Sequence, residues 1–128
     1  MALSADWHEA AANNLDGPNS AFPPPWYPAA RLGDYQILPI EDAASLYREG
    51  TVMHHCVGTS GDRVQRGHLY IYSIRRNGER VATLALGRHD GQTWVEEIRG
   101  PCNTDLPKVT VAAVVRWLHT QRKLLGAN

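Results

Sequence analysis

Three strand-like runs in the middle of the chain constrain its fold more than any other feature. The runs HLYIYSIRR, ERVATLALGR and TWVEEIRG begin at residues 68, 79 and 93, and they are rich in the β-branched and aromatic residues that favour strands. Asn77-Gly78 and Asp90-Gly91 separate them, and these dipeptides suit the positive φ angles of tight hairpin turns. The sequence therefore predicts a three-stranded antiparallel meander, or a slightly larger sheet.

A helix is predicted after the meander. Pro107 fits a first helical position, and apolar residues recur at helical spacing up to Gly126. We expect this helix to cover one face of the sheet with Val111, Val114, Val115, Leu118 and Leu125.

Shorter elements are predicted before the meander. Residues 35–38 favour a strand, which Pro39 either ends or confines to a sheet edge. Residues 40–49 favour a helix that ends at Gly50, a typical C-terminal cap, and residues 60–65 favour another short helix. Together with the meander and the final helix, they predict a single α+β domain over residues 34–128.

The first 33 residues are predicted to form a short helix over residues 4–15 and then a strap rich in Pro, Gly and Asn. The three consecutive prolines of the strap favour an extended conformation. We expect Phe22, Trp26 and Tyr27 to pack the strap onto the domain; the alternative is an exposed ligand groove.

Charge is distributed unevenly along a chain whose formal net charge is zero. Residues 1–50 contain two basic and seven acidic side chains, whereas residues 51–128 contain eleven basic and six acidic ones. This asymmetry favours a basic face that meets phosphates or an acidic partner.

No apolar run approaches the roughly 18 residues of a membrane span, and the N-terminus lacks the pattern of a secretory signal. We expect a cytoplasmic protein without membrane contact, in which Cys56 and Cys102 are thiols.

The stretch EGTVMHHCVG, residues 49–58, concentrates reactive groups. Neighbouring side chains point in different directions, so either His54 or His55 is expected to face a site as a general acid or base; alternatively one of them caps the preceding helix and the other packs on the sheet. Cys56 is a candidate nucleophile if an imidazolium or a helix N-terminus lowers its pKa, and otherwise a buried, inert thiol.

A zinc site would need His54 or His55 together with Cys56 and Cys102. No CxxC is present, and adjacent residues cannot easily bind one tetrahedral ion. We therefore expect no metal and no other cofactor.

A second group of candidates lies in EEIRGPCN, residues 96–103. Arg99 and Asn103 bracket a Gly-Pro turn at a strand end, and Arg75 could join them with backbone N–H groups near Gly58 to bind phosphate or carboxylate. In the alternative interpretation, Arg99 pairs with Glu96 or Glu97 and Asn103 completes a turn.

The blocks YREGTVMHHCVG, VQRGHLYIYSIRRNGERVATLAL and TWVEEIRGPCN, in this order, resemble the PcfJ-like family over roughly residues 32–120. The family commonly has an aromatic residue shortly after CVG, where this chain has Thr59-Ser60-Gly61. The resemblance implies a setting of plasmids, phages, conjugation and other mobile elements, without a settled reaction. It also implies characteristic polar positions at Glu49, His54, His55, Cys56, Gly58, Arg75, Arg99, Gly100 and Asn103.

No P-loop, GxSxG, HExxH or paired-carboxylate signature is present, so whether the protein is an enzyme stays open. The main hypothesis is a domain that binds nucleic acid or a phosphate-bearing ligand, with catalytic candidates His54, His55 and Cys56. One alternative is a non-enzymatic accessory or inhibitor protein, for example against a host defence complex, that acts through protein contacts by Arg63, Arg66 and Arg76. Another is that the cluster is a polar network that specifies the fold.

Overall fold

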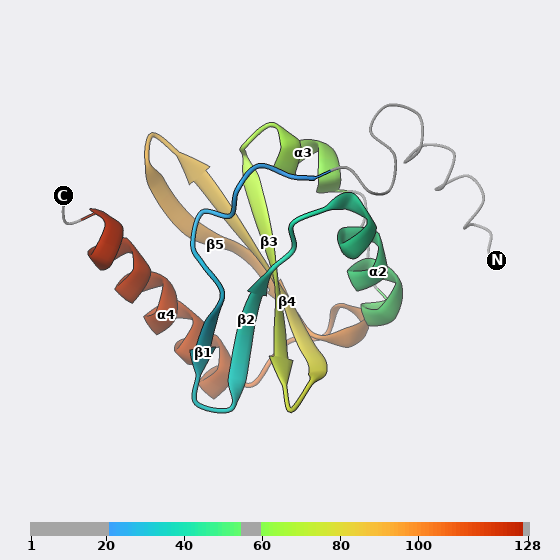
Figure 1. The fold of residues 1–128 in the computed structure, drawn as a ribbon. Helices are drawn as coiled ribbons and strands as arrows, with labels where there is room; N and C mark the ends of the chain where they lie inside the picture. Colours follow the sequence, from blue (N-terminus) through green and yellow to red (C-terminus); the bar gives the residue numbers. More distant parts are fainter. Residues whose placement is uncertain (1–20, 55–59, 127–128) are drawn as a thin grey trace.

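A five-stranded antiparallel sheet forms the centre of the fold (Figure 1). The computed structural model describes residues 21–54 and 60–126. The strands follow chain order across the sheet: β1 Ala30–Leu32, β2 Tyr35–Pro39, β3 Leu69–Arg76, β4 Glu79–His89 and β5 Gln92–Arg99. The predicted α+β class and the meander, β3 to β5, are confirmed. The sheet is larger than three strands because β2 pairs with β3 and the strap contributes β1, which pairs with β2.

The two predicted turns join the strands of the meander. Asn77 and Gly78 have φ angles of 53° and 83°, and Asp90 and Gly91 have φ angles of 52° and 78°. Consecutive positive φ angles match the right-handed twist of the flanking strands. These dipeptides therefore determine both hairpins locally.

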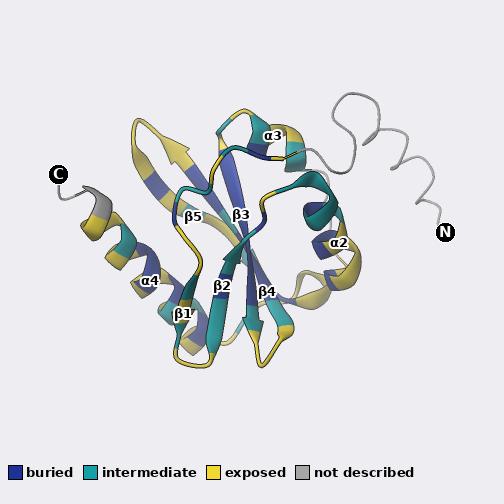
Figure 2. Ribbon diagram, in the orientation of Figure 1, coloured by how far each residue is buried: buried dark blue, intermediate teal, exposed yellow. Residues whose placement is uncertain are grey.

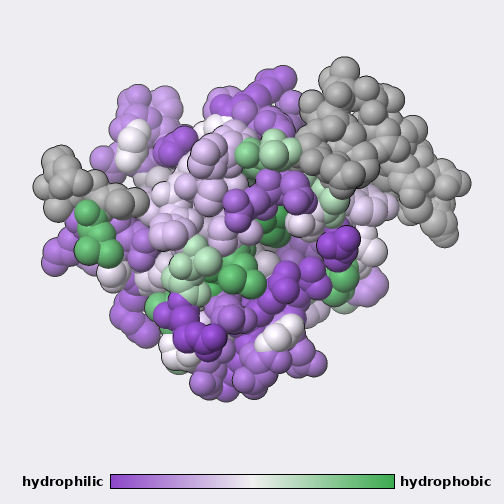
Figure 3. Space-filling model, in the orientation of Figure 1, coloured by the Kyte–Doolittle hydropathy of each residue, from purple (hydrophilic) through white to green (hydrophobic). Residues whose placement is uncertain are grey.

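Helices cover both faces of the sheet. Helices α2 (Ala43–Met53) and α3 (Gly61–Gln65) connect β2 to β3 and pack on one face. Helix α4 (Lys108–Gly126) follows the 3₁₀ turn η2 (Pro101–Asn103) and packs on the other face, where Trp117 contacts Tyr72. The core lies between these layers (Figure 2). On the face of the molecule drawn in Figure 3, hydrophilic side chains dominate and hydrophobic ones form small separate groups.

Two details of the helix predictions are wrong. Helix α2 does not end at Gly50 but continues to Met53, because the Met53 side chain packs in the core and extends the buried face of the helix. In α4, Val115 is 49% exposed. The buried face of α4 instead consists of Thr110, Val114, Trp117 and Leu118.

The described part of the strap, residues 21–33, packs onto the domain as predicted. Phe22 and Tyr27 are buried, and Trp26 packs against the core. The Tyr72 hydroxyl accepts a hydrogen bond from the Tyr27 backbone N–H and donates one to the Tyr27 carbonyl, each at 2.9 Å. The helix predicted over residues 4–15 lies outside the described residues.

Tyr70 and Tyr72 make the stability of this fold sensitive to high pH. Burial, followed by the nearby charge of Glu41, raises the pKa of Tyr70 from 10.0 to about 12, and burial also raises the pKa of Tyr72. The folded protein therefore holds these protons more tightly than the unfolded chain, so the contribution of Tyr70 to stability is complete below pH 10 and is lost as the pH rises through about 12.

We expect the free energy of unfolding to fall over this range in urea titrations at increasing pH, and Tyr70→Phe to make the fall shallower. An identical pH dependence in the variant would contradict this assignment.

Candidate functional site

Helix α2 places a carboxylate between itself and the sheet. Its buried face consists of Leu46, Glu49, Gly50 and Met53, and the spacing of these residues puts them on one side of the helix. Glu49 is only 1% exposed. An acidic side chain this deeply buried needs ionic or hydrogen-bond partners.

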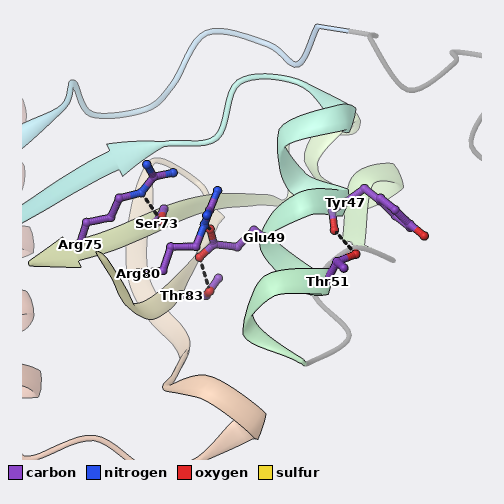
Figure 4. A network of polar contacts seen from close by, with 7 residues as sticks. All are labelled: Tyr47, Glu49, Thr51, Ser73, Arg75, Arg80 and Thr83. Carbon is purple, nitrogen blue, oxygen red and sulfur yellow. Dashed lines mark hydrogen bonds and ion pairs between the residues drawn. The ribbon is translucent and has the colours of Figure 1, made fainter. Parts of the chain in front are cut away.

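Strand β4 supplies two of those partners (Figure 4). The Arg80 Nε donates to Glu49 Oε1 at 2.8 Å, and the Thr83 hydroxyl donates to Glu49 Oε2 at 2.5 Å. Each carboxylate oxygen thus receives a hydrogen bond, one of them from a charged donor. The contacts connect the last turns of α2 to the sheet.

Strand β3 adds a second guanidinium beside this pair. The Arg75 Nε donates to the hydroxyl of buried Ser73 at 3.1 Å, and Figure 4 shows both residues next to the Glu49 contacts. The sheet register explains this arrangement, because Ser73 lies opposite Thr83 and Arg75 lies opposite Arg80. Among the described residues, no ion pair involves Arg75.

We call this group the arginine corner and define it as Glu49, Ser73, Arg75, Arg80 and Thr83. It contains two guanidinium groups and one carboxylate, so one positive charge is not balanced within it. Two hydroxyl groups orient these charges.

Arg99 extends the same row of the sheet but pairs locally. It lies opposite Thr83 in the sheet. Its Nε lies 3.1 Å from Glu97 Oε2, and its Nη1 lies 3.0 Å from Asp105 Oδ1. Glu96 instead pairs with Arg63 at 2.9 Å. The alternative interpretation of Arg99, pairing with a neighbouring glutamate, thus matches the observed contact with Glu97.

Asn103 occupies the turn after β5. It is exposed and has a φ angle of 62°, directly after Cys102 at 58°. The turn is closed by hydrogen bonds between Gly100 and Thr104 and between Thr104 and Pro101. Helix α2, which contains Glu49, and η2, which contains Asn103, lie beside each other (Figure 1).

His54 lies at the end of α2. Its backbone N–H bonds to the Gly50 carbonyl, its φ angle is 57°, and its imidazole is exposed. The backbone of His54 thus caps the helix, while its ring is available to solvent. His55, Cys56 and Gly58 lie outside the described residues, and their predicted roles stay predictions.

A sequence profile described as PcfJ-like protein matches residues 27–114. The chain belongs to the PcfJ-like family. The matched range includes the whole arginine corner as well as Arg99 and Asn103. No curated protein and no solved structure matches the chain significantly.

Three residues of the arginine corner were not predicted from the sequence: Ser73, Arg80 and Thr83. A signal for them exists, because Glu49 lies on the same helical face as apolar Leu46 and Met53. A carboxylate on an apolar face implies a nearby cation or hydrogen-bond donor. The identity of that partner depends on the register between strands, which the sequence alone does not reveal.

Of the four residues considered for a zinc site, His54 and Cys102 are among the described residues, whereas His55 and Cys56 are not. Cys102 is exposed and is not in a disulfide bond. Among residues 21–54 and 60–126, no group of three or more His, Cys, Asp or Glu side chains is arranged to hold a metal ion.

Proposed function

We propose that this PcfJ-like chain binds a phosphate-bearing ligand, a nucleotide or nucleic acid, at the arginine corner. The observation that carries the proposal is that Arg75 has no ion-pair partner among the described residues, although it lies beside a second arginine. A planar guanidinium with free outer N–H groups can bind a phosphate through two parallel hydrogen bonds.

The contacts within the corner support preorganised binding. Ser73 engages the Nε of Arg75, and Glu49 engages the Nε of Arg80, so the terminal nitrogens of both side chains are not used in these bonds. Holding both guanidinium groups before the ligand arrives reduces the side-chain entropy lost on binding. The unbalanced positive charge favours an anionic ligand.

The catalytic candidates follow directly along the chain from α2. We propose that His54 or His55 acts as the general acid or base if the ligand is transformed, because imidazole is the side chain that most often fills this role. Cys56 is the candidate nucleophile, while Arg99, Asn103 and Gly58 are candidates for contacts with the ligand. If the ligand is a nucleic acid, we propose that the protein acts in the transfer or maintenance of a mobile element.

Arg75→Gln tests the proposal. We expect the affinity for a fluorescein-labelled single-stranded oligonucleotide to fall by about an order of magnitude at about 0.1 M salt, since each lost phosphate contact removes one charge-dependent interaction. Fluorescence anisotropy measures the loss, and the melting temperature should stay close to that of the wild type.

Arg76→Gln is the matched control. Arg76 is the next residue of β3 and carries the same charge, but it points to the opposite face, where it contacts Asp34 and the Tyr35 ring. A comparable loss of affinity in both variants would show that net charge, not the arginine corner, governs binding.

The alternative function, an accessory or inhibitor protein that acts through protein contacts, has weaker structural support. The three arginines expected to dominate such a surface are each paired with an acidic neighbour, so their charges are partly neutralised before any partner arrives. The pairs are Arg63 with Glu96, Arg66 with Asp62, and Arg76 with Asp34.

A further inference from the structure

The outer face of α4 carries positive charge without any acidic residue. The helix sequence KVTVAAVVRWLHTQRKLLG contains no Asp or Glu. Its cations are all exposed, and none takes part in an ion pair among the described residues. They are Lys108, Arg116, Arg122 and Lys123.

Helical spacing gathers these cations on one side. Lys108, Arg116 and Lys123 follow each other at intervals of eight and seven residues, which correspond to about two helical turns each. His119 and Arg122 lie on the same side, opposite the buried Trp117. From Lys108 to Lys123 the row extends for roughly 22 Å at 1.5 Å per residue.

The acidic residue nearest to the start of α4 in the chain does not balance this charge. The acidic residue closest before α4 in the chain is Asp105, which contacts Arg99 at 3.0 Å. The helix lies on the face of the sheet opposite α2. The row of cations is therefore separate from the arginine corner.

We infer that this basic face of α4, defined as Lys108, Arg116, His119, Arg122 and Lys123, docks on the phosphate backbone of a nucleic acid. A regular row of unpaired cations over several turns complements a polymer with evenly spaced negative charges. Contacts of this kind position a protein without reading base sequence.

The composition of the face argues against two other partners. An amphipathic helix that binds a membrane inserts its apolar side, but in α4 that side, with Val114, Trp117 and Leu118, is in the core. A protein interface is usually anchored by aromatic side chains, whereas the apolar side chains exposed among these cations are all aliphatic: Val109, Ala112, Val115 and Leu124.

The double variant Arg116→Gln/Lys123→Gln tests the inference with a fluorescein-labelled DNA duplex as the probe. Each phosphate contact changes log K by about 0.9 per tenfold change in salt, so each lost cation should weaken binding roughly eightfold at about 0.1 M salt. The slope of log K against log salt should become shallower by about 2.

Arg63→Gln/Arg66→Gln is the matched control, because it removes the same charge from arginines that pair with Glu96 and Asp62. Equal losses in the two double variants would overturn the inference, as would wild-type binding that favours poly-glutamate or anionic lipid vesicles over DNA. Arg75→Gln distinguishes the basic face of α4 from the arginine corner. If the α4 double variant loses affinity for the duplex while Arg75→Gln keeps it, the inference about α4 stands. This holds even if the arginine corner binds no ligand.

Discussion

Replacing Glu49 with Ala is expected to lower the free energy of unfolding by about 3–5 kcal/mol, the range for removing one partner of a buried ion pair. The substitution leaves Arg80 without its carboxylate partner and deprives the Thr83 hydroxyl of its acceptor. It also creates a cavity beneath α2, where Glu49 is 1% exposed. Urea denaturation followed by circular dichroism measures the change.

Two comparisons separate this effect from a loss of charge. Glu79→Ala removes the same charge from an exposed position after the first hairpin turn, and we expect a change within about 0.5 kcal/mol. In a double-mutant cycle with Arg80→Ala, the two losses should not add, because the residues contact each other. Additive losses, or a Glu49→Ala protein as stable as the wild type, would show that the ion pair does not stabilise the fold.

Replacing Trp117 with Ala is expected to cost about 3–5 kcal/mol, the usual range for deleting a large aromatic side chain from a core. Trp117 is 2% exposed and packs edge-on against two tyrosine rings. The distance between ring centroids is 5.8 Å to Tyr27 and 5.5 Å to Tyr72. The loss should weaken both the docking of α4 and the packing of the strap, since Tyr27 belongs to the strap. Urea denaturation again measures the change.

Trp117→Phe is the informative control. The Trp117 Nε1 is buried and has no hydrogen-bond partner among the described residues, so replacing the indole loses ring volume but no polar contact with that part of the chain. We expect a cost of about 1–2 kcal/mol, well below that of Ala. A cost as large as that of Trp117→Ala would instead indicate that the indole N–H makes a stabilising hydrogen bond.

The parts of the fold predicted correctly depend on local signals. The two hairpins follow from Asn77-Gly78 and Asp90-Gly91, whose conformational preferences act over two residues. Helix α4 follows from apolar spacing over five turns. The part of the sheet that was missed, β1, depends on pairing with β2 after a proline-rich segment, and composition there favours an irregular strap.

The end of α2 shows how tertiary contacts override a local preference. Gly50 is typical of a helix C-cap, but burial of Met53 carries the helix one turn further, and His54 adopts the left-handed cap conformation instead. This shift matters for the site, because Glu49 lies inside α2 and not in its last position, on the same buried face as Met53.

The candidate site could be predicted only in part. Arg75 was a candidate because it lies at a strand end, and Glu49 was identified through the family resemblance, whereas Arg80, Ser73 and Thr83 were missed, because their proximity follows from cross-strand register. For Arg99 the sequence left two interpretations, ligand binding or a pair with Glu96 or Glu97, and the structure shows its guanidinium in contact with Glu97 and Asp105. A sequence shows which charges exist but not which of them neutralise each other after folding.

The most direct test of the proposed function follows the arginine side chains during ligand binding. In ¹⁵N-labelled protein titrated with a short single-stranded oligonucleotide, the Nε–Hε signals of Arg75 and Arg80 should shift in a saturable manner, while that of Arg76 stays unchanged. If the oligonucleotide binds but the signals of Arg75 and Arg80 do not move, the arginine corner is not the ligand site.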